Sequence, residues 1–466
     1  MVAFTDHDKV AGLAAKQGII RNSANTVRHV KDVIGRPWSD LVKYAKESPV
    51  RMLEKGGEVV YQVEYKERLT TFTPIEIAAF IYRKMMETAE SHGGAAESHD
   101  AVITIPTYFN EEKRRIIRRG AQAGGFNVLR MISEPVAAVL AYDIGQKDTD
   151  EACNVLVYKL GGTSLELTVI AVCGGMYRIV STYCDATMGG GVIDHILAEH
   201  FAAEFQRRWK SDCRANKRSL AKLHNGAEMC KHILSTRETA QVSVDSLFDG
   251  IDFQTTIARG RFQSMCSSFL QQCLEPLEDV LKQAGLTKDD IQKVLLCGGC
   301  TKVPSLQQQL AEYFSGAELL SSIAPDEVIA VGAAKQASIL SGLDQAELDQ
   351  CATFTDVACL TSDILIETSR TDGSRYMPVL THHTPVPVRC QKTFTLAPEQ
   401  TQFCLHLLQS SVAQPDPQTL AKIVMKDLPP EAEIKAVFHV KSDGSLHVTC
   451  TEPISDTMQA VTVDAS

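Results

Sequence analysis

The chain has 466 residues, 44% of them hydrophobic, and a formal net charge of −10 at pH 7. This length and composition suit about three domains or lobes with a large folded core, whereas the negative charge argues against direct nucleic-acid binding through bulk electrostatics. No apolar run is long enough to span a bilayer, and no basic segment followed by an apolar one begins the chain, so we expect no membrane partner.

Hydrophobic periodicity and residues typical of helix starts predict the elements of the first 91 residues. Residues 1–5 resemble the middle of a strand more than a free terminus. The pattern at 23–36 predicts a short amphipathic helix with Lys31 near its end. Alternation at 51–72 predicts antiparallel strands, and proline in the first turn predicts a helix over 74–91.

The next stretch alternates strands with helices, which is typical of an α/β fold. Buried strands are predicted at 101–106 and 126–132. Asn110 caps the helix between them, and Glu134 opens a helix directly after the second strand.

Residues 155–169 contain two alternating apolar runs on either side of Gly161 and Gly162, which Thr163 and Ser164 follow. Period-two alternation around a glycine turn predicts a β-hairpin whose tip lacks side chains. Backbone N–H groups at such a tip can approach an anion, so it is a candidate phosphate cradle. A plain turn is the alternative.

The elements after this hairpin again mix strands and helices. We predict, in order, a strand at 176–182, helices at 192–210 and 213–236, a strand at 242–253 and a long helix at 260–284. Residues 293–310 repeat the arrangement of buried strand, glycine turn and helix, and helix N-termini attract anions. A further helix begins at Pro325.

The 14 cysteines are scattered, and several lie within apolar runs. This suits free thiols in a reducing compartment, so we expect a cytosolic protein. Cys297 and Cys300 form a C-x-x-C pair, but no second pair lies at zinc spacing, which leaves metal or redox chemistry as the minor interpretation.

The chain changes character after Gly342. Residues 343–356 are polar and acidic and are interpreted as a linker, and 357–466 are predicted to be all-β with proline-rich turns. Gly444 marks a hairpin turn within this region.

Several segments, in this order along the chain, resemble the heat-shock seventy-kilodalton (Hsp70) chaperone family: NTVRHVKDVIGR, VITIPTYFNE, NVLRMISEPVAAVLAYDIG, VLVYKLGGTSLELTVI, DSLFDGIDF and LLCGGCTKVPSLQ. The resemblance covers essentially the whole chain. It implies an α/β fold with a two-lobed, actin-like (ribonuclease-H-like) ATPase domain at 1–342, the linker at 343–356 and a truncated substrate-binding-like β sandwich at 357–466. The altered glycine loop, degenerate linker and short β domain are most similar to a non-conventional branch that works with a zuotin-type J-domain protein in the ribosome-associated complex.

The resemblance also implies an ATP site. Lys31 matches a phosphate-facing lysine, Glu134 a glutamate near the metal and the attacking water, and Glu166 the other metal-facing carboxylate. The positions matching phosphate and adenosine contacts are Gly161, Gly162, Thr163, Ser164, Glu228, Lys231, Ser235, Gly298, Gly299, Cys300, Lys302 and Asp326. Without the resemblance, Lys31 would be a solvated lysine, and Glu228 with Lys231 a surface pair at i, i+3.

Lys159 departs from the family, which has an aspartate at this position. Hydrated Mg²⁺ needs nearby carboxylates, whereas an ammonium repels the cation and attracts phosphate. We also expect the family's first phosphate hairpin to be absent, because the chain starts after it. We therefore predict negligible ATP hydrolysis, ATP binding that is weak or lost, doubtful Mg²⁺ binding, and only vestigial roles for Lys31 and Glu134.

The predicted function is that of a non-hydrolysing subunit that holds a J-domain partner at the ribosome, assists folding of nascent polypeptides and supports a conventional 70-kDa heat-shock chaperone. The ribosome would be contacted through the partner. The polar linker and the lack of a helical lid after Ser466 argue against nucleotide-controlled peptide trapping. An ATP-hydrolysing chaperone would need an acidic residue in place of Lys159, and a small-molecule kinase of the actin-like superfamily would leave residues 357–466 unexplained.

Overall fold

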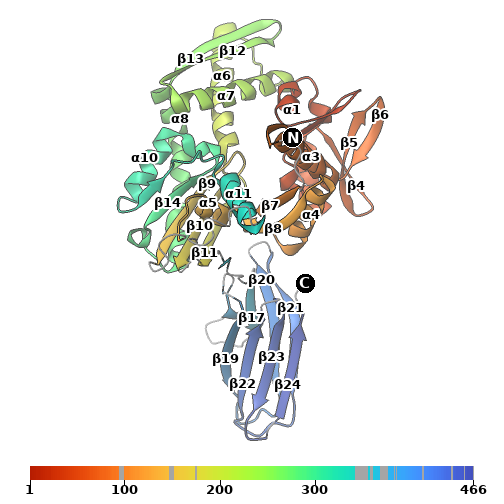
Figure 1. Ribbon diagram of the computed structural model, residues 1–466, viewed down its shortest axis with the longest axis vertical. Helices are drawn as coiled ribbons and strands as arrows, with labels where there is room; N and C mark the ends of the chain where they lie inside the picture. The colour runs from red at the N-terminus through yellow and green to blue at the C-terminus, as the bar shows by residue number, and fades with distance from the viewer. Residues whose placement is uncertain are drawn as a thin grey trace. The chain divides into compact units, whose positions relative to one another are not determined.

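The structure is a computed structural model, and it describes residues 1–93, 99–145, 152–173, 176–341, 355–356, 360, 362–367, 376–381, 384, 386–411, 414–441, 444–455 and 457–464. The chain divides into two compact units (Figure 1). The first comprises Met1–Lys147, Cys153–Val169 and Thr182–Cys351, and the second comprises Asp148–Ala152, Ile170–Ser181 and Ala352–Ser466.

The N-terminal residues form the middle strand of a small sheet. Strand β1 (Val2–Phe4) pairs antiparallel with β2 (Lys9–Ala11) on one side and with β3 (Thr26–Val27) on the other. All three residues of β1 are buried. The expectation that residues 1–5 lie in mid-strand is therefore confirmed.

The helix predicted over 23–36 is wrong. This segment forms a 3-10 turn at Ser23–Asn25, the strand β3, and a second 3-10 turn, η2, at Val30–Asp32. Both residues of β3 are β-branched and buried against β1, an environment that favours strand over helix. His29 has a φ of 55°, a left-handed conformation that a continuous right-handed helix cannot contain.

Around this sheet lie the other elements of what we call the first lobe, residues 1–145 together with helix α11. The antiparallel strands expected at 51–72 are present as a three-stranded sheet. The bounds are α1 (Leu13–Gly18), α2 (Trp38–Glu47), β4 (Arg51–Lys55), β5 (Glu58–Tyr65), β6 (Arg68–Phe72), α3 (Pro74–Gly93), β7 (Asp100–Ile105), α4 (Glu111–Ala123), β8 (Asn127–Ser133), α5 (Glu134–Ala141) and α11 (Val328–Ser341). Strands β7 and β8 pair in parallel, and the side chain of Asn110 caps α4 by accepting from the Lys113 N–H at 3.0 Å, as expected.

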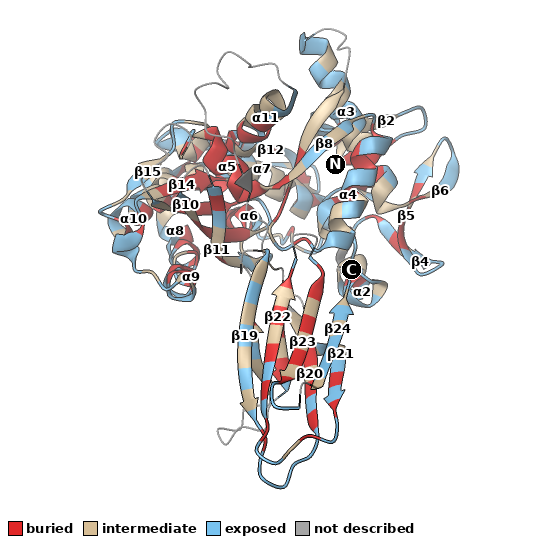
Figure 2. Ribbon diagram, turned by 60° about the horizontal axis from the view of Figure 1, so that its bottom comes forward, coloured by how far each residue is buried: buried red, intermediate tan, exposed pale blue. Residues whose placement is uncertain are grey.

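Helix α5 is buried along its whole length (Figure 2). Helix α11 crosses it so closely that a Cβ on Gly332 would lie 1.7 Å from the carbonyl oxygen of Ala137. Only glycine allows this contact. The close crossing holds α5, whose first residue is Glu134, against α11.

The second lobe, residues 152–327, contains most of a six-stranded sheet in the order β15-β14-β9-β10-β11-β16. The sheet strands are β9 (Cys153–Leu160), β10 (Leu165–Cys173), β11 (Met176–Asp185), β14 (Lys293–Cys297), β15 (Glu318–Leu320) and β16 (Thr355–Asp356). Strands β9 and β10 are neighbours joined by the glycine turn, which confirms the predicted hairpin. Most of the linker predicted at 343–356 lies outside the described residues, but its last two residues form β16 and pair in parallel with β11.

Two elements of the second lobe differ from expectation. The strand predicted at 242–253 is a hairpin of β12 (Thr239–Phe248) and β13 (Ile251–Ala258), whose turn contains Asp249 and Gly250 with positive φ. The helix predicted at 260–284 is two helices, because Pro276 lacks an N–H and starts a new one. The bounds are α6 (Gly190–Trp209), α7 (Lys217–Thr236), α8 (Arg259–Gln272), α9 (Pro276–Ala284), η4 (Gly299–Lys302) and α10 (Pro304–Tyr313). Within the described ranges, no helix is both long and apolar enough to cross a bilayer.

The described residues of the C-terminal region form strands and turns without a helix, as expected. Its strands form two four-stranded sheets, β18-β17-β20-β21 and β19-β22-β23-β24. They are β17 (Asp363–Glu367), β18 (Tyr376–Leu380), β19 (Val388–Thr395), β20 (Phe403–Ser411), β21 (Gln414–Met425), β22 (Glu433–Val440), β23 (Leu446–Glu452) and β24 (Thr457–Val463). Alternate residues of β22 and β23 are buried (Figure 2), and side chains such as Leu407 and Phe438 join the two sheets in one core. Gly444 lies in the β22–β23 turn with a φ of 84°.

Candidate functional site

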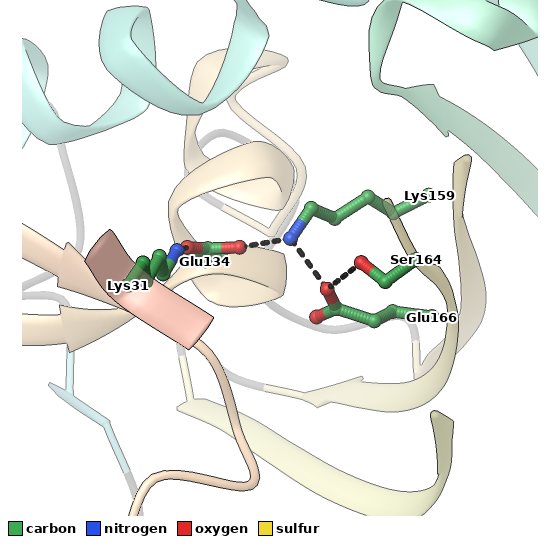
Figure 3. Close-up of polar contacts among 5 residues, drawn as sticks. All are labelled: Lys31, Glu134, Lys159, Ser164 and Glu166. Atoms are coloured by element: carbon green, nitrogen blue, oxygen red, sulfur yellow. Dashed lines mark hydrogen bonds and ion pairs between the residues drawn. The ribbon is translucent and has the colours of Figure 1, made fainter. Parts of the chain in front are cut away.

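Three charged residues meet where the β9–β10 hairpin approaches the start of α5 (Figure 3). Lys159 is the penultimate residue of β9, Glu166 lies on β10, and Glu134 is the first residue of α5. The Lys159 ammonium donates to Glu166 Oε1 at 2.8 Å and also to Glu134 Oε2. Ser164 Oγ donates to the same Glu166 oxygen at 2.9 Å. One lysine thus joins two buried carboxylates.

Lys31 completes this group from the other side of Glu134. It lies on η2 of the first lobe, and its ammonium donates to Glu134 Oε1. The two oxygens of Glu134 therefore accept from two different lysines. The Glu134 side chain is 6% exposed and that of Lys159 17%, whereas that of Lys31 is 45% exposed and remains open to solvent. We call Lys31, Glu134, Lys159 and Glu166 the charged quartet.

The pKa values within the quartet follow from burial and from pairing. Burial by itself raises the pKa of Glu134, but the adjacent Lys31 and Lys159 outweigh it and hold this pKa below its ordinary value of 4.5. Burial lowers the pKa of Lys159, but Glu134 and Glu166 outweigh it and raise this pKa above 10.5. Both groups are therefore charged at neutral pH.

The quartet does not fit a divalent metal. Hydrated Mg²⁺ binds through one or two carboxylates with free oxygens. Here both oxygens of Glu134 and one oxygen of Glu166 already accept from lysine, and the ammonium of Lys159 would repel the cation. In the described parts of the chain, no three His, Cys, Asp or Glu side chains converge as a metal-binding set.

The glycine turn between β9 and β10 fits an anion better. Gly161 N–H donates to the Ser164 carbonyl at 2.9 Å and closes the turn. Gly162 and Thr163 are exposed, and their N–H groups have no hydrogen-bond partner in the described residues. Adjacent backbone N–H groups of this kind form an anion-binding concavity. These residues and Lys31 could therefore contact the phosphates of a nucleotide.

The start of α6 packs directly against this turn. Gly190 N–H donates to the Gly161 carbonyl and Gly191 N–H to the Gly162 carbonyl, each at 2.9 Å. A Cβ on Gly189 would lie 2.6 Å from the Gly162 carbonyl oxygen, so a side chain at this position would displace the turn. The turn is thus held in place by backbone contacts that need small residues.

Glu228, Lys231 and Ser235 lie on one face of α7. Glu228 and Lys231 do not form an ion pair with each other but pair with residues of other helices. Lys231 is buried, donates to the Gly190 carbonyl at 3.1 Å and lies 2.7 Å from Asp194 Oδ1. Glu228 instead accepts from Lys16 at 2.6 Å. Ser235 Oγ donates to the Lys231 carbonyl at 2.9 Å. Lys231 therefore links α7 to the start of α6, next to the glycine turn.

The second glycine turn lies against the first. Gly298 has a φ of 84°, its N–H donates to the Pro325 carbonyl at 2.7 Å, and a Cβ on it would lie 2.3 Å from the Leu160 carbonyl oxygen. Lys302 pairs with Asp326 at 2.6 Å, which closes this side of the site. Gly299 is exposed and borders the same turn.

Cys300 and Cys297 are free, buried thiols, and burial raises the pKa of both. A protonated thiol is a poorer metal ligand and a poorer nucleophile than a thiolate. Cys300 packs against the start of α6, where a Cβ on Gly190 would lie 2.3 Å from its sulfur. The geometry gives this C-x-x-C pair a packing role.

The sequence indicated candidate residues for this site, but three contacts emerge only from the structure. They are those of Lys159 with Glu134, of Lys16 with Glu228 and of Lys231 with Asp194. The only local signal for Asp194 was its place in the helix after three glycines, and Lys16 carried none. These contacts join residues that are far apart in the chain, so local pattern does not show them.

Comparison with known proteins agrees with the geometry. A family model described as Hsp70 protein matches residues 1–466. The chain is similar to heat shock 70 kDa protein 14-B of Xenopus laevis, with 41% identity over 472 aligned residues that cover 100% of this chain and 92% of the relative. It is likewise 42% identical to heat shock 70 kDa protein 14 of Danio rerio and 40% identical to that of Homo sapiens, with the same coverage.

Proposed function

The chain belongs to the Hsp70 family, and on that premise we propose that it is a non-hydrolysing subunit of a ribosome-associated complex. Members of this family are chaperones that bind ATP, and the two-lobed α/β unit followed by a small β sandwich is their fold. The proposed subunit holds a zuotin-type J-domain protein and assists the folding of nascent polypeptides in the cytosol.

The observation that carries this proposal is the bridge from Lys159 to Glu134 and Glu166. Metal-assisted cleavage of ATP depends on a cation that neutralises the phosphates and aligns the attacking water. In this chain the carboxylates that would face the cation are bound to an ammonium. The site therefore supports a chaperone-family protein that does not turn over ATP.

ATP itself remains a candidate ligand of the proposed subunit. Lys31 and the exposed turn at Gly162 and Thr163 offer donors to phosphate, and the Gly298 turn with Lys302 and Asp326 borders the position expected for adenosine. Bound without cleavage, ATP would stabilise the folded chain rather than drive a cycle.

The proposed partners follow from similarity and charge. Full-length similarity to proteins named heat shock 70 kDa protein 14 supports a role in the non-conventional branch. The net charge of −10 supports contact with ribosomal RNA through the J-domain partner rather than through this chain. A conventional 70-kDa heat-shock chaperone would supply the ATP hydrolysis that this chain lacks.

Affinity capture of the tagged full-length chain from a eukaryotic cell lysate tests the proposal. We expect a J-domain protein and ribosomal proteins to be identified by mass spectrometry. After ribosomes are removed by sedimentation, the J-domain protein should still be captured and the ribosomal proteins should not. If no J-domain protein is captured under either condition, the proposal that this chain holds a J-domain protein is wrong, whether or not the chain hydrolyses ATP.

A further inference from the structure

The formal charges of the quartet sum to zero, because two lysines face two glutamates. If the residue at position 159 were acidic, the same four positions would hold one positive and three negative charges. The resulting deficit of two charges equals the charge of one divalent cation. Lys159 therefore supplies, as part of the chain, the charge that a bound divalent metal would otherwise supply.

We infer that Lys159 is a built-in replacement for the divalent metal, so that this site takes a nucleoside polyphosphate without a metal ion. The inference rests on the proposed function, since it concerns the same site. It goes further in naming the form of the ligand, which is the uncomplexed nucleotide rather than its Mg²⁺ complex.

The quartet leaves donors for phosphate after its own bonds are made. A lysine ammonium has three N–H groups, of which Lys159 uses two on glutamates and Lys31 uses one. Figure 3 shows both ammonium groups beside the Glu134 carboxylate, with that of Lys159 also reaching Glu166 on β10. With the N–H groups of Gly162 and Thr163, the remaining donors can pair with phosphate oxygens, and charge-assisted bonds of this type are strong.

A metal ion would have to break this arrangement before it could bind. It would displace the ammonium of Lys159 from two carboxylates, both of which are buried. The displaced ammonium would have little access to water, because its side chain is 17% exposed. The cation and the ammonium would also repel each other at close range. Metal binding is therefore disfavoured by both desolvation and charge.

Calorimetric titration of ATP into the purified full-length chain tests the inference, once with excess EDTA and once with excess Mg²⁺. We expect a dissociation constant with EDTA that is no weaker than the one with Mg²⁺, and no binding heat when Mg²⁺ is titrated alone. Lys159→Asp restores a metal-facing carboxylate and should bind ATP about tenfold or more tightly with Mg²⁺ than with EDTA. Lys43→Asp makes the same charge change on an exposed lysine of α2 and should titrate like the wild type.

Each outcome bears on the inference separately from the proposed function. Wild-type binding that requires Mg²⁺ overturns the inference, and so does the absence of ATP binding under both conditions. Neither outcome contradicts the proposed function, because a protein can fail to bind ATP in this way and still not hydrolyse it. The proposed absence of hydrolysis would be contradicted only by release of phosphate from ATP. Circular dichroism shows whether Lys159→Asp is folded, and if it is not, the two wild-type titrations still decide.

Discussion

Lys159 lies 2.8 Å from Glu166 across the β9–β10 hairpin, and the same ammonium reaches Glu134 at the start of α5. Position 159 thus connects a strand of the second lobe with a buried helix of the first. A lysine at this point gives the protein an internal ion pair where metal chemistry would need free carboxylate oxygens.

Replacing Lys159 with methionine is expected to destabilise the first unit by about 3–5 kcal/mol, because two buried carboxylates lose their shared partner. Urea unfolding followed by fluorescence measures the loss. Lys293→Met is the matched control, since Lys293 pairs with Glu318 at 2.6 Å on the partly exposed edge of the same sheet. Its loss should be about 0–1 kcal/mol. Equal losses for the two variants would contradict the structural importance of the bridge.

Acid should destabilise the protein partly through Glu134. Its pKa is below 4.5 in the folded state, so its contribution to the free energy of unfolding is present above pH 4.5 and is lost as the pH falls through the lower folded value. Glu134→Gln removes this titration. Plotted against pH, the unfolding free energy of the variant should fall less steeply below pH 4.5 than that of the wild type. Parallel curves would show that Glu134 has no depressed pKa.

The crossing of α5 and α11 predicts a strong effect at one glycine. Gly332→Ala places a Cβ against the Ala137 carbonyl, so the helices must separate, and overpacking of this kind typically costs about 1–3 kcal/mol. Gly260→Ala is the control, because Gly260 lies in α8 with no atom within 4 Å of the added Cβ. It should be neutral or stabilising by up to about 1 kcal/mol. Thermal unfolding of both variants provides the comparison.

The Lys16–Glu228 pair offers a test of how the two lobes are joined at their outer ends. Its side chains are 44% and 30% exposed, so we expect a coupling free energy of only about 0.2–1 kcal/mol. A double-mutant cycle with alanine at each position, followed by urea unfolding, measures it. The cycle for Lys159 and Glu134 should give a clearly larger coupling. A reversed order would mean that the outer pair, not the quartet, holds the lobes together.

Elements with strong local signals could be predicted from the sequence. Alternation around Gly161 located β9 and β10, and Asn110 marked the start of α4. Residues 23–36 could not be assigned in this way, because their helical spacing is overridden by the pairing of β3 with β1. The break between α8 and α9 was predictable, because Pro276 within the segment 260–284 is a local signal for the start of a new helix.

The sequence indicated candidate site residues but not the contacts between them. Likeness to a family identified Lys31, Glu134 and Glu166, and the unusual charge of Lys159 was evident. Its partner Glu134 lies 25 residues earlier in a different element, so only the fold shows that one ammonium satisfies both carboxylates. Because of this contact, the lysine in place of an acidic residue at position 159 gives a charged quartet with no net charge.

The most direct test of the central claim is steady-state phosphate release from Mg²⁺-ATP by the purified full-length chain. Lys31→Ala, prepared identically, accounts for contaminating ATPases. The lysine bridge predicts that the wild type and the variant release phosphate at the same background rate. Mg²⁺-dependent turnover in the wild type that Lys31→Ala abolishes would contradict the account.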